Sequence, residues 1–148
     1  MSKLLNIIGM TRQERCLFFG GVFLMPLVRI GLLFCSTRRI GSLLEAANRR
    51  FPARPAERRL EVRRAARRLT QAAQFCPVPL TCLAEALAGR ALLARYGLSS
   101  ELRIGVRRSD SMIEAHAWLE CPGDVLIGNP MPKGKQYVPL SGAERLMG

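Results

Sequence analysis

The sequence predicts an α+β protein in which an N-terminal helical region precedes a core of one helix packed on a small antiparallel sheet. Apolar residues recur at three- and four-residue spacing up to about Gly97, which is typical of helices, and at two-residue spacing from Glu101 onward, which is typical of strands. With 148 residues, 49% of them hydrophobic, the chain can bury one core. We assign residues 1–55 to the helical region and residues 56–148 to the core, and expect a single compact unit.

The first helix is expected to begin at Thr11, because Thr11 and Glu14 have the spacing of a capping box. Residues 16–35 then form a run that is apolar except for Arg29 and long enough to cross a bilayer. Arg29, Pro26 and three glycines favour two short buried helices, or one kinked helix, covered by other helices. Since no secretion signal is evident, we expect a cytoplasmic protein, with membrane association as the less favoured alternative.

The middle of the chain predicts two further helices. Apolar residues at 40, 43, 44 and 47 indicate one helix, and the run from Phe51 to Pro55 interrupts it. Helix is expected to resume at about Ala56 and to end before Pro77. Thr81 is the natural N-cap of the next helix, which places Cys82 in its first turn, where the helix dipole favours a thiolate.

The end of the chain predicts a sheet. Gly97 is expected to terminate the helix that begins at Cys82, and a hairpin follows, with strands around residues 102–106 and 113–120 and a polar turn at 108–111. A third strand is expected at residues 125–127. The only histidine, His116, lies on the second strand, with Trp118 pointing to the same side.

Charge and cysteine content limit the functional classes. The formal net charge is +12, and residues 38–68 contain eleven arginines against three glutamates. This stretch would attract any polyanion, or it would simply be a solvated helix face. Five irregularly spaced cysteines suit a reducing compartment, and no CxxC pair, phosphate loop or G-x-S-x-G elbow occurs. We therefore expect no metal and no cofactor.

Cys82 and His116 are the residue types that thiol-dependent acyl transfer requires. Such catalysis needs an activated thiol, an imidazole that exchanges protons with it, and a third group that orients the imidazole. The 34 residues that separate Cys82 from His116 would allow a helix and a hairpin to bring them together. The alternative is that both residues only pack in the core.

Several segments resemble the lasso-peptide leader peptidase family, whose members have a transglutaminase-like, papain-like fold. The resemblance lies in T-C-L at 81–83, L-R-I-G-V at 102–106, A-H-A-W-L-E at 115–120 and V-L-I-G at 125–128. It is looser in the N-terminal half. The resemblance implies that Cys82 is the nucleophile and His116 the general base and acid.

The third catalytic position is open, because the family usually has an aspartate shortly after the histidine strand. Asn129 is the preferred counterpart and Asp124 the alternative; an asparagine would orient the imidazole but stabilise its cation less. Trp118 would bind substrate or pack beside the histidine. Gln71 and Gln74 precede the nucleophile, and we interpret both as solvated helix residues outside the site.

The resemblance implies a cysteine peptidase that removes the leader from a lasso-peptide precursor. It further implies a separate leader-binding protein that presents the precursor, since the predicted regions occupy the whole chain, and an ATP-dependent lactam-forming cyclase that acts on the freed core. No nucleic acid is expected as a partner under this interpretation. The alternatives are a transglutaminase-type acyl transferase and a non-enzymatic basic module that binds nucleic acid or a protein partner.

Overall fold

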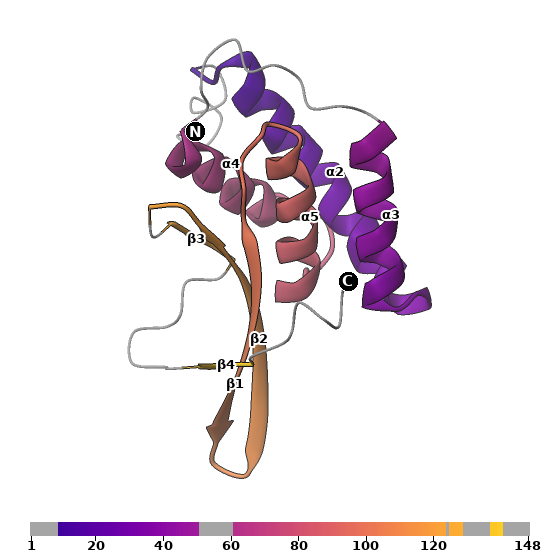
Figure 1. Ribbon diagram of the computed structural model, residues 1–148, viewed down its shortest axis with the longest axis vertical. Coiled ribbons are helices and arrows are strands. Elements are labelled where there is room, and N and C mark those ends of the chain that lie inside the picture. The colour runs from indigo at the N-terminus through magenta and orange to yellow at the C-terminus, as the bar shows by residue number, and fades with distance from the viewer. Residues whose placement is uncertain (1–8, 51–60, 124, 129–136, 141–148) are drawn as a thin grey trace.

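The computed structural model describes residues 9–50, 61–123, 125–128 and 137–140 and confirms the α+β class. Helices gather at one end of the molecule, and a long hairpin extends past them (Figure 1). In chain order the elements are α2 (Arg12–Phe34), α3 (Thr37–Arg50), α4 (Val62–Gln74), α5 (Cys82–Ala94), β1 (Glu101–Ser109), β2 (Met112–Cys121), β3 (Val125–Ile127) and β4 (Val138–Pro139).

Helix α2 begins where the sequence predicts. The Thr11 N–H donates to the Glu14 carboxylate at 2.8 Å, and the Glu14 N–H donates to the Thr11 hydroxyl at 3.2 Å, which is a complete capping box. The helix then continues for 23 residues with Pro26 inside it. Of the two predicted alternatives, two short helices are therefore wrong and a single helix is correct, because the one backbone hydrogen bond that a proline removes does not end this helix.

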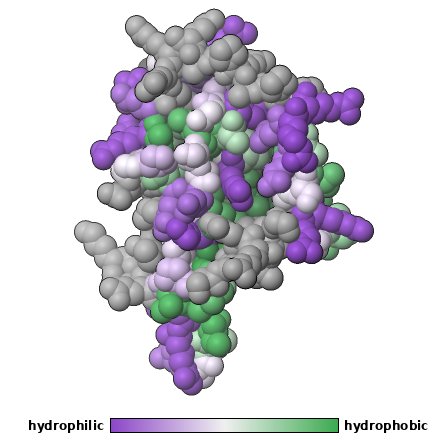
Figure 2. Space-filling view, viewed as in Figure 1, coloured by the Kyte–Doolittle hydropathy of each residue, from purple (hydrophilic) through white to green (hydrophobic). Residues whose placement is uncertain are grey.

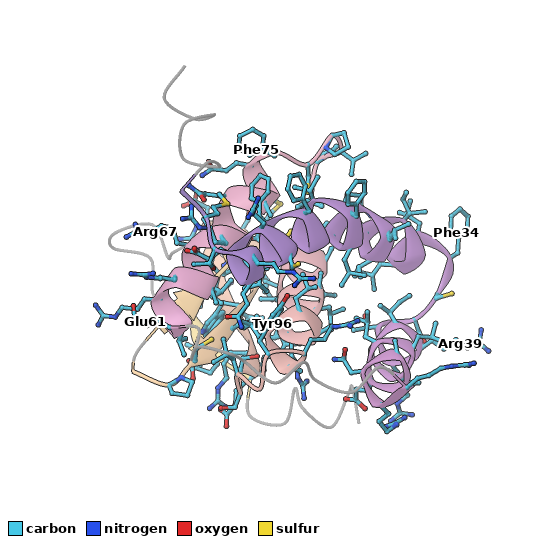
Figure 3. The ribbon with its side chains drawn as sticks, turned by 90° about the horizontal axis from the view of Figure 1, so that it is seen from above. Phe34, Arg39, Glu61, Arg67, Phe75 and Tyr96 are labelled. Carbon is cyan, nitrogen blue, oxygen red and sulfur yellow. The ribbon has the colours of Figure 1, made fainter. Side chains whose placement is uncertain are left out.

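The prediction that other helices cover α2 is correct for one side only. Leu17, Met25 and Val28 are at most 4% exposed on its inner side. The opposite side, which we call the outer face of α2, is largely exposed and consists of Phe19, Phe23, Leu27, Ile30, Leu33 and Phe34. Figure 3 shows Phe34 pointing outward at the far end of this helix and Phe75 near its start.

Among the described residues, α2 is the one helix that is long and apolar enough to cross a membrane. Length and composition alone do not distinguish a membrane span from a helix of a soluble protein. Its inner side packs against α4 and α5, and a Cβ added at Gly21 would lie only 2.7 Å from the Ala72 Cβ of α4. Glycine at position 21 thus allows the two helices to approach closely.

A buried ion pair also joins α2 to α4. The Arg68 Nε donates to the Glu14 carboxylate at 3.2 Å, and Glu14 is only 3% exposed. Burial alone would raise the pKa of Glu14, but the hydrogen bonds from the Thr11 N–H and from Arg68, with the charge of Arg68, outweigh it and lower that pKa. The glutamate that caps α2 therefore also positions α4.

Helices α3 and α4 differ in how closely they match the sequence prediction. Helix α3 lies where the apolar spacing predicts it, but α4 begins at Val62, six residues after the predicted start at Ala56. The backbone of Glu61 is extended (φ −65°, ψ 131°), so no helix runs through it into α4. Residues 51–60 lie outside the described part of the chain.

The sheet is antiparallel, with strand order β3-β2-β1-β4. The β1–β2 hairpin turns through Asp110, at φ +50°, and Ser111. Ala117 and Leu119 of β2 are buried against the helices, whereas Ile113 near the hairpin tip is 77% exposed. The space-filling view shows both hydrophobic and hydrophilic atoms on this projecting hairpin (Figure 2).

One hydrophobic core joins the helices to the sheet. Helix α5 lies at its centre and is buried on most sides, between α2 and β2. The largest fully buried side chains come from α2, α4, α5 and all three longer strands: Leu17, Met25, Leu69, Leu93, Leu102, Leu119 and Ile127. The N-terminal end of α5 lies at the edge of this core, and the predicted nucleophile lies there.

Candidate active site

Cys82 is the first residue of α5, as predicted. Thr81 is the N-cap (φ −92°, ψ 150°), and its hydroxyl accepts from the Ala84 N–H at 3.3 Å. The Thr81 carbonyl accepts from the Glu85 N–H at 3.1 Å. Among the described residues none accepts from the N–H groups of Cys82 and Leu83 at the end of the helix, where the dipole favours negative charge. The half-buried Cys82 thiol therefore lies beside backbone donors suited to an anion.

The other cysteines are less suited to act as nucleophiles. Burial, with a smaller contribution from the charge of Glu85, raises the pKa of Cys76, whose thiol donates to the Ala72 carbonyl at 3.4 Å. Burial also raises the pKa of Cys121, which is 7% exposed. Cys16 lies in the N-terminal part of α2, and Cys35 is the C-cap of that helix. Only Cys82 combines partial exposure with the N-terminal end of a helix.

His116 lies on β2 and contacts two aromatic rings. Its imidazole is stacked on Trp118 with ring centroids 6.1 Å apart and an interplanar angle of 16°, and it lies 5.4 Å from the Tyr137 ring. Trp118 is itself fixed, because it is 5% exposed and its Nε1 donates to the Glu120 carboxylate at 3.2 Å. The two rings therefore restrict where the imidazole can lie.

Gly105 makes this aromatic cluster possible. It lies opposite His116 in the β1–β2 register. A Cβ at this position would be 2.8 Å from Cη2 of Trp118 and 2.9 Å from Cβ of Tyr137, closer than carbon atoms pack. The absence of a side chain at Gly105 thus lets Trp118 and Tyr137 close over the strand beside the histidine.

Cys82 and His116 line the same open cleft, which has a volume of about 560 Å³. The cleft lies between the end of α4, the start of α5 and β2. Its other lining residues are Thr70, Ala73, Gln74, Leu80 and Glu85. The structure therefore brings together the predicted nucleophile and the predicted base in a space that a peptide segment could enter.

The remaining predicted site residues have different positions. Trp118 is not among the residues that line this cleft; its ring is stacked on the imidazole of His116. Asn129 and Asp124, the two candidates for the third catalytic position, lie outside the described residues.

Sequence reasoning missed four residues of the site. Glu85 could have been found from its spacing, because it follows Cys82 by three residues and so shares its helix face. Gln74, interpreted from the sequence as a solvated residue, lines the cleft at the end of α4, with Thr70 one turn before it. Tyr137 had no signal, since only the pairing of β4 with β1 brings it to His116.

A second cavity, of about 280 Å³, lies between α3 and α5 and is lined mainly by apolar atoms, with Asn48, Arg49 and Arg90 at its edge. It contains neither the thiol nor the imidazole. Within the described ranges, no three His, Cys, Asp or Glu side chains gather as a metal site would require. The cleft at Cys82 is the one that both a cysteine and the histidine line.

Comparison with known proteins identifies the family of the chain. The family model described as the transglutaminase-like superfamily matches residues 24–141. Searches of curated proteins and of solved structures found no match. The superfamily includes cysteine peptidases and acyltransferases, and its members are typically enzymes that resemble cysteine proteases. Because the match covers most of the chain, the protein belongs to the transglutaminase-like superfamily.

Proposed function

We propose that the protein is a cysteine peptidase in which Cys82 is the nucleophile and His116 the general base and acid. The observation that carries this proposal is the cleft shared by the thiol at the start of α5 and the imidazole on β2. Membership in the transglutaminase-like superfamily supports the same type of thiol chemistry. The contacts of His116 with Trp118 and Tyr137 would hold the imidazole in place.

The proposed reaction has two steps. The Cys82 thiolate attacks a peptide carbonyl, the Cys82 N–H binds the resulting oxyanion, and His116 protonates the amine that leaves. Water then gives a proton to His116 and attacks the thioester, which releases the acid and regenerates the thiol. Asn129, or alternatively Asp124, would orient the imidazole in both steps.

The substrate we propose is a lasso-peptide precursor, from which the enzyme removes the leader. The segments around Cys82 and His116 that resemble the leader peptidases support this assignment. A separate leader-binding protein would present the precursor, and an ATP-dependent cyclase would use the amine that cleavage frees. The outer face of α2 supports the existence of a partner, because a contiguous exposed apolar surface of this kind usually marks an interaction site.

The test is mass spectrometry of a cognate precursor incubated with the leader-binding protein and the enzyme. We expect wild type and Cys76→Ala to release the leader, and Cys82→Ala to release none. Cys76→Ala is the matched control, since it removes a second thiol from the same region. Leader release by Cys82→Ala would refute the proposal, and joining of the leader to an added amine would assign the acyl transferase instead.

A further inference from the structure

Glu85 is the acidic residue of the cleft that the proposed reaction does not use. It follows Cys82 by three residues on α5, so the two side chains share a helix face at a separation of about one turn. Glu85 lines the cleft together with Cys82 and His116. A group on a substrate bound at Cys82 would therefore come within reach of its carboxylate.

Glu85 differs from most other glutamates of the described residues in having no cationic partner. Glu14, Glu61, Glu101, Glu114 and Glu120 each form an ion pair with an arginine. Glu85 forms no ion pair and no hydrogen bond with any residue that the structure describes, although the chain carries a net charge of +12. The negative charge of this half-buried carboxylate is therefore not balanced by a cation among the described residues, although the protein is strongly basic.

No lysine or arginine is among the described residues that line the cleft with Glu85. The other lining residues are Ala73, Leu80, the hydroxyl of Thr70, the amide of Gln74 and the two proposed catalytic groups. Burial raises the pKa of Glu85, which means that its charged form is poorly stabilised here. A cationic group that entered the cleft would form a charge-assisted hydrogen bond in a partly desolvated place, where such bonds contribute most.

We propose that Glu85 forms a subsite for a lysine or arginine side chain at the last or the second-last position before the bond that is cleaved. The protein would then select peptides with a basic residue beside the cleavage point, through an ion pair that no described residue of the chain makes with Glu85. This inference rests on the proposed peptidase function and adds the substrate class to it. It assigns to Glu85 contact with substrate and no part in bond breaking.

The experiment uses the full chain and tripeptide chloromethyl ketones, which alkylate the active thiol of a cysteine peptidase. Lysine is compared with norleucine, its uncharged analogue, in the pairs Ala-Ala-Lys and Ala-Ala-norleucine, and Ala-Lys-Ala and Ala-norleucine-Ala. Intact-protein mass spectrometry gives each alkylation rate. In at least one pair we expect the lysine probe to react about tenfold faster with wild type, the factor given by about 1.4 kcal/mol.

Three variants make the test specific. In Glu85→Gln the ratio of lysine to norleucine rates should fall to about one, whereas Glu45→Gln, the same charge change at an exposed residue of α3, should keep the wild-type ratio. A ratio near one in wild type, or a ratio that Glu85→Gln does not lower, would overturn the subsite. Equal slowing of all probes in Glu85→Gln would also overturn it and place Glu85 with the catalytic pair.

The same labelling rates distinguish a failure of the subsite proposal from a failure of the proposed peptidase function. Cys82→Ala should lose the fast labelling and keep only the slow labelling expected of an exposed thiol such as Cys16. Labelling of Cys82→Ala at the wild-type rate, or wild type that no probe labels at Cys82, would refute the thiol nucleophile and the subsite with it. Labelling at Cys82 without preference for lysine would refute the subsite alone.

Discussion

Gly105→Ala is expected to impair the enzyme by displacing the rings that hold His116. The new Cβ would lie 2.8 and 2.9 Å from Cη2 and Cζ3 of Trp118 and 2.9 Å from Cβ of Tyr137. These distances are about 0.6 Å shorter than ordinary carbon contacts of about 3.5 Å. Trp118 cannot simply rotate away, because it is 5% exposed and hydrogen-bonded to Glu120. The rings beside the imidazole must therefore shift.

The overpacking in Gly105→Ala should lower both the stability of the fold and the rate of cleavage. A clash with two fixed groups destabilises a fold by about 1–3 kcal/mol, and a displacement of a catalytic group approaching 1 Å costs up to about 100-fold in rate. We expect leader cleavage to fall by about 10- to 100-fold while the protein stays folded at 25 °C. Circular dichroism monitors the fold, and cleavage is followed by mass spectrometry.

The matched control is Gly31→Ala, which adds the same methyl group 2.8 Å from the end of the Ile40 side chain, between α2 and α3. It is remote from the cleft, so its cleavage rate should stay within about twofold of wild type, as is usual for a distant substitution that leaves the fold intact. If Gly105→Ala cleaves as fast as Gly31→Ala, the packing around Gly105 does not position His116.

Three further predictions concern the cap, the ion pair and the outer face of α2. Thr81→Ala should lower stability by about 1 kcal/mol through loss of the N-cap and should slow Cys82 alkylation, as thermal melts and labelling rates will show. Thr81→Ser should keep both the stability and the alkylation rate of wild type. Wild-type labelling of Thr81→Ala would show that the cap does not influence the reactivity of the Cys82 thiol. Because the pKa of Glu14 is lowered in the fold, its stabilisation is complete above about pH 4.5 and is lost as pH falls through the folded pKa. Urea unfolding should therefore show wild type losing more stability than Glu14→Gln between about pH 5 and pH 3, and equal losses would contradict this. Phe23→Ser, at a side chain that is 69% exposed, should abolish co-elution with the leader-binding protein without lowering the melting temperature. Phe18→Ser, at a buried ring, should lower the melting temperature. Unchanged co-elution of Phe23→Ser would show that the outer face of α2 is not part of the interface.

Most of the fold follows from local sequence signals. The capping box at Thr11, the N-cap at Thr81 and the positive φ of Gly97, +70°, end or begin helices as the sequence predicts. The change to two-residue spacing locates the hairpin correctly. These features depend on residues within a few positions of one another, which is why a single sequence predicts them.

Features that depend on distant parts of the chain were not predictable in the same way. The apolar run in α2 does not indicate which face is covered, because hydrophobicity is present on both sides of the helix. The extended backbone at Glu61 has no sequence signal that separates it from the charged residues before it.

The site divides along the same line. Cys82 and His116 were predicted from residue type and motif, and the structure places both at one cleft; Glu85 could have been predicted from its helical spacing. Tyr137 and Gln74 reach the site only through tertiary packing of β4 and α4, which no local pattern encodes.

If His116 activates the thiol of Cys82, this thiol should react before the other cysteines. The measurement is competition among the five cysteines for a limiting amount of iodoacetamide, read by peptide mapping. Cys16 is an exposed internal reference in α2 that is not among the residues lining the cleft. We predict that Cys82 is labelled first, and that His116→Ala slows the labelling of Cys82 while the labelling rate of Cys16 stays unchanged. Faster labelling of Cys16 than of Cys82 in wild type, or equal Cys82 rates with and without His116, would contradict this prediction.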